Sequence, residues 1–271
     1  MIFVRDKGRM CNNILQYGHL YAWARANNRK TVSMRFAYKY QYFHICRTRW
    51  HNFFVYLLAK YAAKLKLIPT VTFDTPDEDL TEKENAMRRG CLVAEGWFAR
   101  WYDLFLQYKP EILSLFAFDS HIENKVTSLL ETSSKEGIIR LGVHIRRGDY
   151  ATWNNGRFLY DDKQMVNIIR QFILLHPRKR IVIYICGNDP KLNKQAYSEA
   201  FGQESVVFPQ GNPGEDLCLL AHCDYLIGPP STFTLVASMY RNTPLYWIKD
   251  INKPLQEDSF DYFDNLFRNI I

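Results

Sequence analysis

A histidine and two arginines end a short aliphatic run in LGVHIRRGDYATW, residues 141–153. Successive side chains of a β-strand point to opposite faces, so Val143 and Ile145 would share one face, and His144 and Arg146 the other. An arginine guanidinium is planar, keeps its charge at any working pH, and can donate paired hydrogen bonds to a phosphate. These residue types therefore predict that a diphosphate binds at the carboxyl end of a strand.

The neighbouring residues leave alternatives open. Arg147 either contacts the ligand or pairs with a carboxylate such as Asp149, whereas for Arg146 we favour the ligand. Arg147, Gly148 and Asp149 also form the integrin-adhesion tripeptide. A three-residue match often arises by chance, and this one follows a core strand directly instead of lying in a free loop. We therefore set adhesion aside.

A second strand-turn-helix pattern occurs in IGPPSTFT, residues 227–234. Ser231 or Thr232 can cap the helix that follows, and the N–H groups at such a helix start can hold a phosphate oxygen. Helix capping alone is the alternative for this segment. Two such sites on one sheet favour the phosphate.

The predicted elements explain why these two segments would meet. In the first half, a strand at residues 2–5 precedes a helix, and a later helical stretch breaks at Pro110. From Gly137 on, strands alternate with helices, which predicts βαβ units and a parallel sheet. The predicted strands are 138–145, 181–186, 206–208, 225–227 and 245–248, and the predicted helices are 162–175, 192–201, 215–221 and 232–239. In such sheets, ligands bind outside the carboxyl ends of the strands.

The composition is that of a globular protein with a sizeable core, because 47% of the 271 residues are hydrophobic and 15% are aromatic. The six cysteines include no CxxC pair and are interpreted as buried thiols. The first residues, MIFVRDKGRM, lack the apolar core of a signal peptide, and no stretch approaches the ~18 apolar residues that span a bilayer. We expect a cytoplasmic protein.

The net charge of +7 is unevenly distributed. Residues 7–73 contain no Asp or Glu, which indicates either an anionic partner or a solvated basic face. Their twelve basic residues are Lys7, Arg9, Arg25, Arg29, Lys30, Arg35, Lys39, Arg47, Arg49, Lys60, Lys64 and Lys66. Interleaved aromatic residues also fit a nucleic-acid-binding protein, but part of them belong to a helical stripe of the kind usually found in a core. That stripe consists of Phe54, Leu57, Leu58, Tyr61 and Leu65. The same charges suggest peripheral contact with the anionic inner face of a membrane.

Four sequence blocks resemble, in order, those of the α-1,2-fucosyltransferases. HIRRGDY (144–150) resembles the family motif HxRRxDY, and GRMCNNILQY (8–17) resembles its glycine-rich opening GxxGNQxFQY. Trp97 lies in EGWFARWYDLF, which is similar to the block GYxQSxKYF. GEDLCLLAHCDYLIGPPSTF (214–233) resembles a further block, so that the matches cover most of residues 8–248.

The resemblance implies an α/β enzyme of GT-B-like fold, with two Rossmann-like lobes and a central donor cleft. It would move fucose from GDP-fucose to a glycan hydroxyl, with inversion and without a metal ion or cofactor. An α-1,2 linkage to a galactoside in polysaccharide or oligosaccharide synthesis is the first expectation. Transfer of another sugar from a GDP-sugar, protein O-fucosylation, and a basic nucleic-acid-binding protein are the alternatives. The change of sequence pattern predicts lobes at residues 1–130 and 131–250, with 251–271 packing back on the first lobe.

The resemblance also implies roles for single residues. Arg146 would hold the β-phosphate and stabilise the GDP leaving group. Asp149 is the nearest carboxylate that could serve as general base, with Glu95 as its rival. The other predicted donor contacts are His144 beside the nucleotide, Asp216 at the guanine edge, Ser231, Thr232 and Phe233 around the diphosphate and nucleoside, and Arg9 and Asn12 from the first lobe.

The chain departs from the family pattern at several positions. Cys11 replaces a glycine and Asn13 a glutamine, while Pro229-Pro230 and Leu235-Val236 stand where many members have asparagine and paired tryptophans. These changes bear on the acceptor and the donor sugar more than on GDP. Residues 77–79, Asp-Glu-Asp, have the DxD form of a metal site, but we interpret them as the acidic start of a surface helix.

Overall fold

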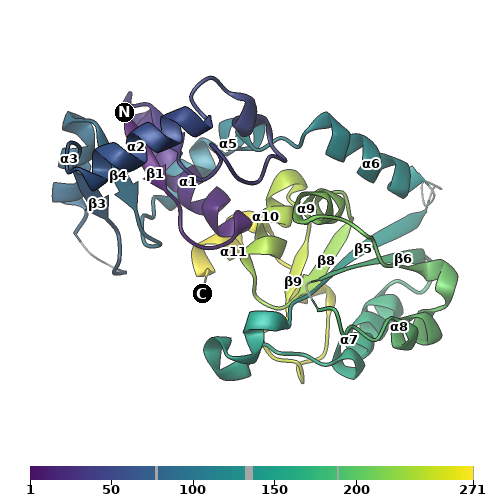
Figure 1. Cartoon of the computed structure of the whole chain (residues 1–271). Coiled ribbons are helices and arrows are strands. Elements are labelled where there is room, and N and C mark those ends of the chain that lie inside the picture. Colours follow the sequence, from purple (N-terminus) through teal and green to yellow (C-terminus); the bar gives the residue numbers. More distant parts are fainter. Residues whose placement is uncertain (77–78, 132–136, 188, 271) are drawn as a thin grey trace. The chain divides into compact units, whose positions relative to one another are not determined.

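The computed structural model describes residues 1–271 except 77–78, 132–136, 188 and 271, and comprises two compact units, Met1–Asp119 and Ser120–Ile271 (Figure 1). Each unit contains a parallel β-sheet with helices packed on it. This arrangement confirms the predicted α/β class with parallel sheets in both halves. The central cleft between lobes stays a prediction.

The amino-terminal unit has a four-stranded parallel sheet in the order β2-β1-β4-β3. Phe3 and Val93 on one face of this sheet pack with Ala59 of α2. Pro110 is the second residue of α5, as its fixed φ and missing N–H predict. The elements are β1 (Ile2–Arg5), α1 (Met10–Ala26), β2 (Thr31–Ser33), the 3₁₀ helix η1 (His44–Arg47), α2 (Phe53–Lys64), β3 (Thr70–Thr72), α3 (Thr81–Arg89), β4 (Leu92–Glu95), α4 (Tyr102–Gln107) and α5 (Lys109–Leu115).

The carboxy-terminal unit has a five-stranded parallel sheet in the order β7-β6-β5-β8-β9. Helices α7 and α8 lie on one face of this sheet, and α9 and α10 on the other (Figure 1). The elements are α6 (Ser120–Glu131), β5 (Ile138–Ile145), α7 (Asp162–Leu175), β6 (Arg180–Gly187), α8 (Lys194–Phe201), β7 (Val206–Val207), α9 (Pro213–Ala221), β8 (Tyr225–Gly228), α10 (Thr232–Arg241), β9 (Leu245–Trp247) and α11 (Phe263–Leu266). Short 3₁₀ helices are η2 (Gly148–Ala151), η3 (Trp153–Gly156), η4 (Gln203–Ser205), η5 (Glu257–Ser259) and η6 (Phe267–Asn269).

The unit boundary lies eleven residues before the predicted one, at Asp119 instead of residue 130. The physical reason is α6, which packs on α9 and joins it through an ion pair between Lys125 Nζ and Glu215 Oε2 at 2.6 Å. Residues 251–271 were expected to pack on the first lobe, but the structure assigns them to the carboxy-terminal unit. There Asp261 bridges the edge strand β9 at Leu245, and α11 packs on α10.

The apolar stripe of α2 is the clearest correction to the sequence analysis. Its periodicity is helical as predicted, yet Phe54, Leu58 and Leu65 are exposed, and the core side of the helix is formed by Ala59. The cysteines are all free thiols, and Cys91 is exposed, whereas we expected all of them to be buried. Among the described residues, no helix combines the length and apolar character needed to cross a bilayer.

Candidate functional site

The order of the carboxy-terminal sheet defines a natural ligand position. From β5 the chain first adds β6 and β7 on one side, and then β8 and β9 on the other. The connections therefore diverge between β5 and β8, and in open α/β sheets this switch point is where ligands bind, outside the carboxyl ends of the strands. Arg146 directly follows β5, and Ser231 follows β8 and starts α10. The two segments singled out by sequence thus lie at one end of adjacent strands.

Arg146 is held in place by two neighbours of the same turn. Its Nε and Nη2 donate to Oδ1 and Oδ2 of Asp149 at 3.0 and 2.8 Å, a paired contact that fixes the plane of the guanidinium. The guanidinium carbon also lies 5.3 Å from the ring centre of Tyr150. Tyr150 in turn donates its hydroxyl to the Pro230 carbonyl, so it ties the loop after β5 to the loop after β8.

His144 is buried and stacks on Phe233 of α10, with ring centres 4.9 Å apart and planes 17° from parallel. Burial, and then the charge of Arg146, lower the pKa of His144 to about 3, so the imidazole is neutral at physiological pH. Its Nδ1 is buried without a hydrogen-bond partner among the described residues. The structure thus brings His144 and Phe233 together, as part of the predicted set of donor contacts.

Ser231 is the N-cap of α10, and its Oγ accepts a hydrogen bond from the Phe233 amide at 3.1 Å. Thr234 Oγ1 donates to the Ser231 carbonyl and accepts from Trp247 Nε1 at 3.0 Å, which anchors the first turn of the helix. Thr232 is half-buried in that turn. The predicted capping role of Ser231 is confirmed by this geometry, and phosphate binding at the same helix start stays a prediction.

Asp216 lies in the first turn of α9, whose start is fixed by a capping box between Asn212 and Glu215. Burial, and then the neighbouring Glu215, raise the pKa of Asp216 to about 6. A Cβ at Gly211 would lie 2.9 Å from Asp216 Oδ1, so a side chain at this position would crowd the carboxylate. A half-buried carboxylate with a raised pKa is typical of a functional position.

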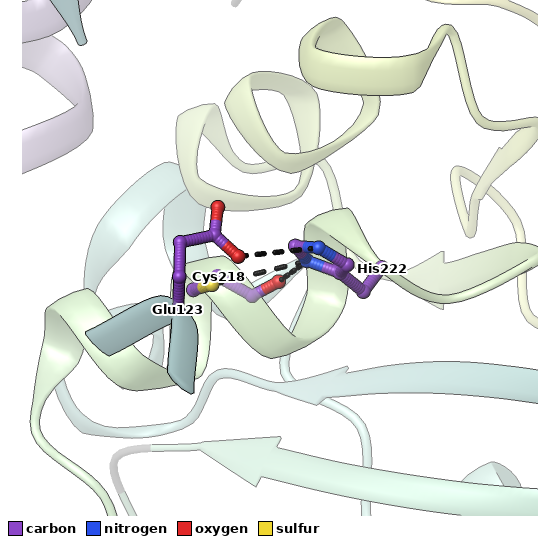
Figure 2. A group of neighbouring side chains, drawn as sticks. All are labelled: Glu123, Cys218 and His222. Carbon is purple, nitrogen blue, oxygen red and sulfur yellow. Dashed lines mark hydrogen bonds and ion pairs between the residues drawn. The ribbon is translucent and has the colours of Figure 1, made fainter. Parts of the chain in front are cut away.

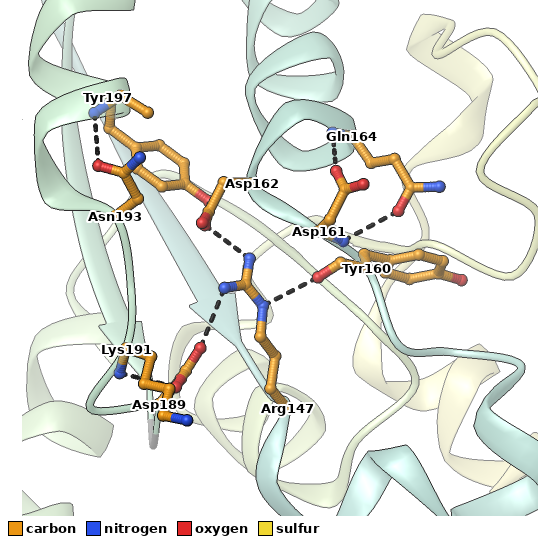
Figure 3. A network of polar contacts seen from close by, with 10 residues as sticks. Arg147, Tyr160, Asp161, Asp162, Gln164, Asp189, Lys191, Asn193 and Tyr197 are labelled. Carbon is orange, nitrogen blue, oxygen red and sulfur yellow. Dashed lines mark hydrogen bonds and ion pairs between the residues drawn. The ribbon is translucent and has the colours of Figure 1, made fainter.

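Arg147, by contrast, is the centre of a structural network (Figure 3). Its Nε donates to the Tyr160 carbonyl at 2.9 Å, Nη1 to Asp189 at 3.0 Å, and Nη2 to Asp162 at 2.6 Å. The Tyr197 hydroxyl donates to the same oxygen of Asp162 at 2.9 Å. Of the two roles left open for Arg147, the structure shows pairing with carboxylates, and the partners described are Asp162 and Asp189.

Arg9 and Asn12 belong to the amino-terminal unit, where they form the turn and first residues of α1 after β1. Gly8 has φ +89°, and a Cβ there would lie 2.7 Å from Asn12 Nδ2, so this turn requires glycine. Glu95 ends β4 and accepts a hydrogen bond from Arg5 Nη1 at 3.0 Å. The approach of Arg9 and Asn12 to a nucleotide stays a prediction.

A cationic cavity of about 500 Å³ lies within the amino-terminal unit, next to α2 and the ends of β1 and β2. Arg35 donates to the Asp6 carbonyl at 3.1 Å and to the Tyr38 hydroxyl at 2.9 Å. Burial raises the pKa of Asp6 to about 8, so its carboxyl adds little negative charge at neutral pH. The cavity is lined by Arg5, Asp6, Met34, Arg35, Tyr38, Tyr56, Lys60, Ala63, Lys64 and Thr70.

Among the described residues, Glu123, Cys218 and His222 lie close enough for their ligand atoms to share a metal ion (Figure 2). His222 Nδ1, however, donates to the Cys218 carbonyl at 2.8 Å, and its Nε2 lies 3.4 Å from Glu123 Oε2. Burial, and then the charge of Glu123, raise the pKa of the Cys218 thiol well above its ordinary value, so the thiol is protonated in this contact. We interpret the group as a polar contact between α6 and α9.

The Asp-Glu-Asp segment at 77–79, which has the DxD form of a metal site, lies partly outside the described residues. These omit Asp77 and Glu78. Asp79 is described, and its Oδ1 accepts hydrogen bonds from the Thr81 amide and hydroxyl at 2.9 and 2.7 Å, at the start of α3. This contact is the one expected for an acidic helix start. The absence of a catalytic metal stays a prediction.

The chain is similar to known sugar transferases. The chain is 22% identical to mouse galactoside 2-alpha-L-fucosyltransferase Sec1 over 266 residues, which cover 94% of the chain and 68% of that protein. Its fold is similar to that of POFUT1 in complex with GDP, with a TM-score of 0.59, 11% identity, and coverage of 89% of this chain and 94% of that one. No family model matches the chain.

Two further solved structures share the fold. A mutant of Arabidopsis thaliana FUT1 in complex with GDP has a TM-score of 0.58 and 11% identity, with coverage of 96% of this chain and 73% of that one. The α-1,6-fucosyltransferase NodZ, soaked with GDP-fucose, has a TM-score of 0.55 and 15% identity, with coverage of 96% and 98%. These similarities confirm the predicted fold class, and together with the mouse relative they support the prediction of a glycosyltransferase.

Proposed function

We propose that the protein transfers fucose from GDP-fucose to a hydroxyl of a glycan, with inversion, and forms an α-1,2 linkage to a galactoside. The observation that carries this proposal is the group at the switch point of the carboxy-terminal sheet. There, an oriented Arg146 follows β5 and the capped start of α10 follows β8. The similarity to fucosyltransferases whose structures contain GDP or GDP-fucose supports the choice of donor.

In this proposal Arg146 acts on the leaving group. Negative charge builds up on the diphosphate as the bond between fucose and phosphate breaks, and a guanidinium fixed in advance stabilises that charge. The guanidinium carries more N–H donors than Asp149 occupies, so donors remain for the β-phosphate. The start of α10, at Ser231, Thr232 and Phe233, would turn the positive end of the helix dipole toward the phosphate oxygens.

The nucleoside would be held by Asp216 and by the aromatic pair of His144 and Phe233. Guanine offers two adjacent N–H donors on one edge, and a carboxylate accepts both. The neutral His144 imidazole carries no charge that would repel or attract the base, so its contribution is packing beside the nucleotide. Arg9 and Asn12 complete the proposed set from the amino-terminal unit.

The role of Asp149 is the point at which the structure changes the expectation most. Both of its carboxylate oxygens accept hydrogen bonds from Arg146, which suits a residue that positions the arginine. A carboxylate engaged in this way is less available to take the proton of the acceptor hydroxyl. We therefore propose positioning as the first role of Asp149, with the general-base role as the alternative.

The acceptor would bind in the cationic cavity of the amino-terminal unit. Arg35, Lys60 and Lys64 line it together with two tyrosines, a combination that suits a sugar bearing a carboxylate or phosphate. An acidic oligosaccharide should then have a lower KM than its neutral counterpart. Lys60→Gln with Lys64→Gln should remove that preference and leave the KM for GDP-fucose unchanged; an unchanged acceptor preference would rule the cavity out.

A transfer assay tests the proposed function. The purified protein would be incubated with GDP-fucose and neutral and acidic galactosides, with EDTA, and products identified by mass spectrometry and linkage by NMR. Fucosylated product in EDTA is expected, and GDP-mannose should not replace the donor. Product formed from a different GDP-sugar, or only on a protein acceptor, would favour the alternative transferases, and activity that required manganese would contradict the metal-independent mechanism.

We also propose a cytoplasmic enzyme that makes peripheral contact with an anionic membrane. The acid-free, basic residues 7–73 support this location. Nucleic acid is not a proposed partner, because phosphate binding at the switch point serves a single nucleotide and the comparisons point to sugar transfer. A salt-sensitive affinity for oligonucleotides without any response to GDP would reverse that choice.

A further inference from the structure

Helix α2 carries apolar side chains over most of its surface, but Ala59 is its one fully buried residue. Ala59 is buried against Met34 and Val93, which attaches the helix to its own unit. On the outer side, the side chains of Phe54, Leu58 and Leu65 are 82%, 70% and 67% exposed. Trp50, Phe53, Tyr61 and Leu67, in the helix or beside it, are also exposed. So large an exposed apolar surface marks an interaction site.

The exposed side chains form a continuous stripe. Phe54, Leu58, Tyr61 and Leu65 follow one another at intervals of four, three and four residues, which places them on one face of the helix. The helix starts at a well-formed cap, in which Asn52 Oδ1 accepts from the Val55 amide at 3.1 Å. A stripe parallel to the axis of a stable helix can lie flat on a planar surface.

Cations border this stripe. Arg49, Lys60, Lys64 and Lys66 are exposed, and residues 7–73 contain no acid that could neutralise them. The Lys60 ammonium lies 6.0 Å from the Tyr61 ring centre, so charge and apolar surface are direct neighbours. A long lysine side chain can keep its charge at the level of lipid phosphates while its stem stays with the apolar residues.

We propose that α2 docks the amino-terminal unit on an anionic lipid bilayer, with the stripe Phe54–Leu58–Tyr61–Leu65 inserted at the boundary between headgroups and acyl chains. Tyr61 within the stripe and Trp50 just before α2 are of the residue types that favour this boundary. The inference rests on the membrane contact proposed above. Phe54, Leu58 and Leu65, which carry its test, do not line the cationic cavity, so the test can fail without the transfer reaction failing.

Two other occupants fit the surface less well. A second copy of the chain would bring the cations beside each stripe close to those of its partner. These like charges would repel each other, and residues 7–73 contain no acid to neutralise them. A nucleic acid would find phosphate partners in Arg49 and the lysines but none for Leu58 and Leu65, which cannot stack on bases. An anionic lipid bilayer offers acyl chains to the apolar stripe and phosphates to the cations beside it.

Vesicle co-sedimentation tests the proposal. The full chain should sediment with vesicles of phosphatidylcholine and phosphatidylglycerol, and less with phosphatidylcholine alone. Phe54→Ser with Leu58→Ser and Leu65→Ser should lower the partition coefficient at least about tenfold, because three exposed apolar side chains no longer insert. Leu174→Ser is the matched control, because Leu174 is 76% exposed on α7 of the other unit; it should bind like the unaltered chain.

Two further measurements test the cations beside the stripe and the depth of Trp50 in the bilayer. Arg49→Gln with Lys66→Gln should weaken binding and reduce its dependence on salt. Lipids brominated near the headgroup should quench tryptophan fluorescence, and Trp50→Phe should remove most of that quenching. No sedimentation with anionic vesicles at low salt, or sedimentation of the triple serine variant equal to that of the unaltered chain, would overturn the proposal. So would light scattering that shows a dimer which the triple variant converts to a monomer.

Discussion

Asp149 accepts two hydrogen bonds from Arg146, from Nε at 3.0 Å and from Nη2 at 2.8 Å, across a single turn at the end of β5. The side chain of Arg146 is 14% exposed and that of Asp149 is 45% exposed. The arginine is therefore the inner member of the pair, and the carboxylate holds it from the solvent side. An orientation fixed before the substrate arrives needs no rearrangement during the reaction, which is what makes such a group effective.

Arg146→Ala should leave the protein folded and remove most of its activity. Loss of one preorganised donor at a developing negative charge lowers kcat by roughly 10²–10³. Arg178→Ala, an exposed arginine of the same unit, is the control and should retain full activity. Steady-state kinetics with GDP-fucose measures the effect, and turnover of Arg146→Ala equal to that of the control would refute its assignment.

Asp149→Asn distinguishes a positioning residue from a general base. If Asp149 positions Arg146, the amide keeps one contact, and kcat should fall by about tenfold at every pH. The acid limb of the pH–rate profile should keep its midpoint. A limb that disappears in the variant would instead identify Asp149 as the base, and an unchanged kcat would exclude both roles.

Arg147→Ala should have the opposite phenotype to Arg146→Ala. Removal of Arg147 leaves the carboxylates of Asp162 and Asp189 without their cation in a largely buried network, so the free energy of unfolding should fall by about 3 kcal/mol. Urea denaturation followed by circular dichroism measures this loss. Residual activity should follow the folded fraction. A stable but inactive Arg147→Ala would show that Arg147 acts on the ligand.

GDP binding should weaken at acid pH through Asp216. Its pKa of about 6 in the free protein means that the carboxylate is charged above pH 6 and protonated below it. Guanine N–H donors need the charged form, so affinity should be about tenfold lower at pH 5 than at pH 7.5. Calorimetric titration of GDP at both pH values measures the difference.

Asp216→Asn supplies the control for that titration. The variant should bind GDP weakly at both pH values and lose its preference over inosine diphosphate, which lacks the guanine amino group. Asp258→Asn, at an exposed acid, should behave like the unaltered chain. If Asp216→Asn keeps both the pH dependence and the preference for guanine, a residue other than Asp216 recognises the guanine ring.

The local part of the site was predictable because it depends on neighbouring residues. The bounds of β5 and α7 agree with the predicted 138–145 and 162–175, since long apolar runs and regular helical spacing are strong signals. The strands β2 and β3 were not predicted, because three residues are too few for a period to emerge. The boundary between the units was misplaced because the packing of α6 on α9 leaves no mark in local sequence.

Contacts between residues that lie far apart in the sequence could not be predicted, because they leave no local sequence pattern. The two acids that pair with Arg147 follow it by 15 and 42 positions, and nothing in the local pattern connects them. Tyr150, which joins the loop after β5 to Pro230, was part of the motif but was not singled out, since its hydroxyl partner is 80 positions away. The stripe on α2 shows a further limit, because periodicity reveals an apolar face but not whether another element covers it.

The thermal stability of the purified protein against a nucleotide panel tests the central claim most directly. GDP, GDP-fucose, GDP-mannose, UDP-glucose and CMP would each be added in EDTA. A ligand that binds only the folded form stabilises it by about 2.7 kcal/mol at a hundredfold excess over its dissociation constant. The account predicts a rise in midpoint with GDP and GDP-fucose, and a smaller one in Arg146→Ala. No shift with either guanine nucleotide would contradict the proposed donor site and leave only the fold in common with the fucosyltransferases.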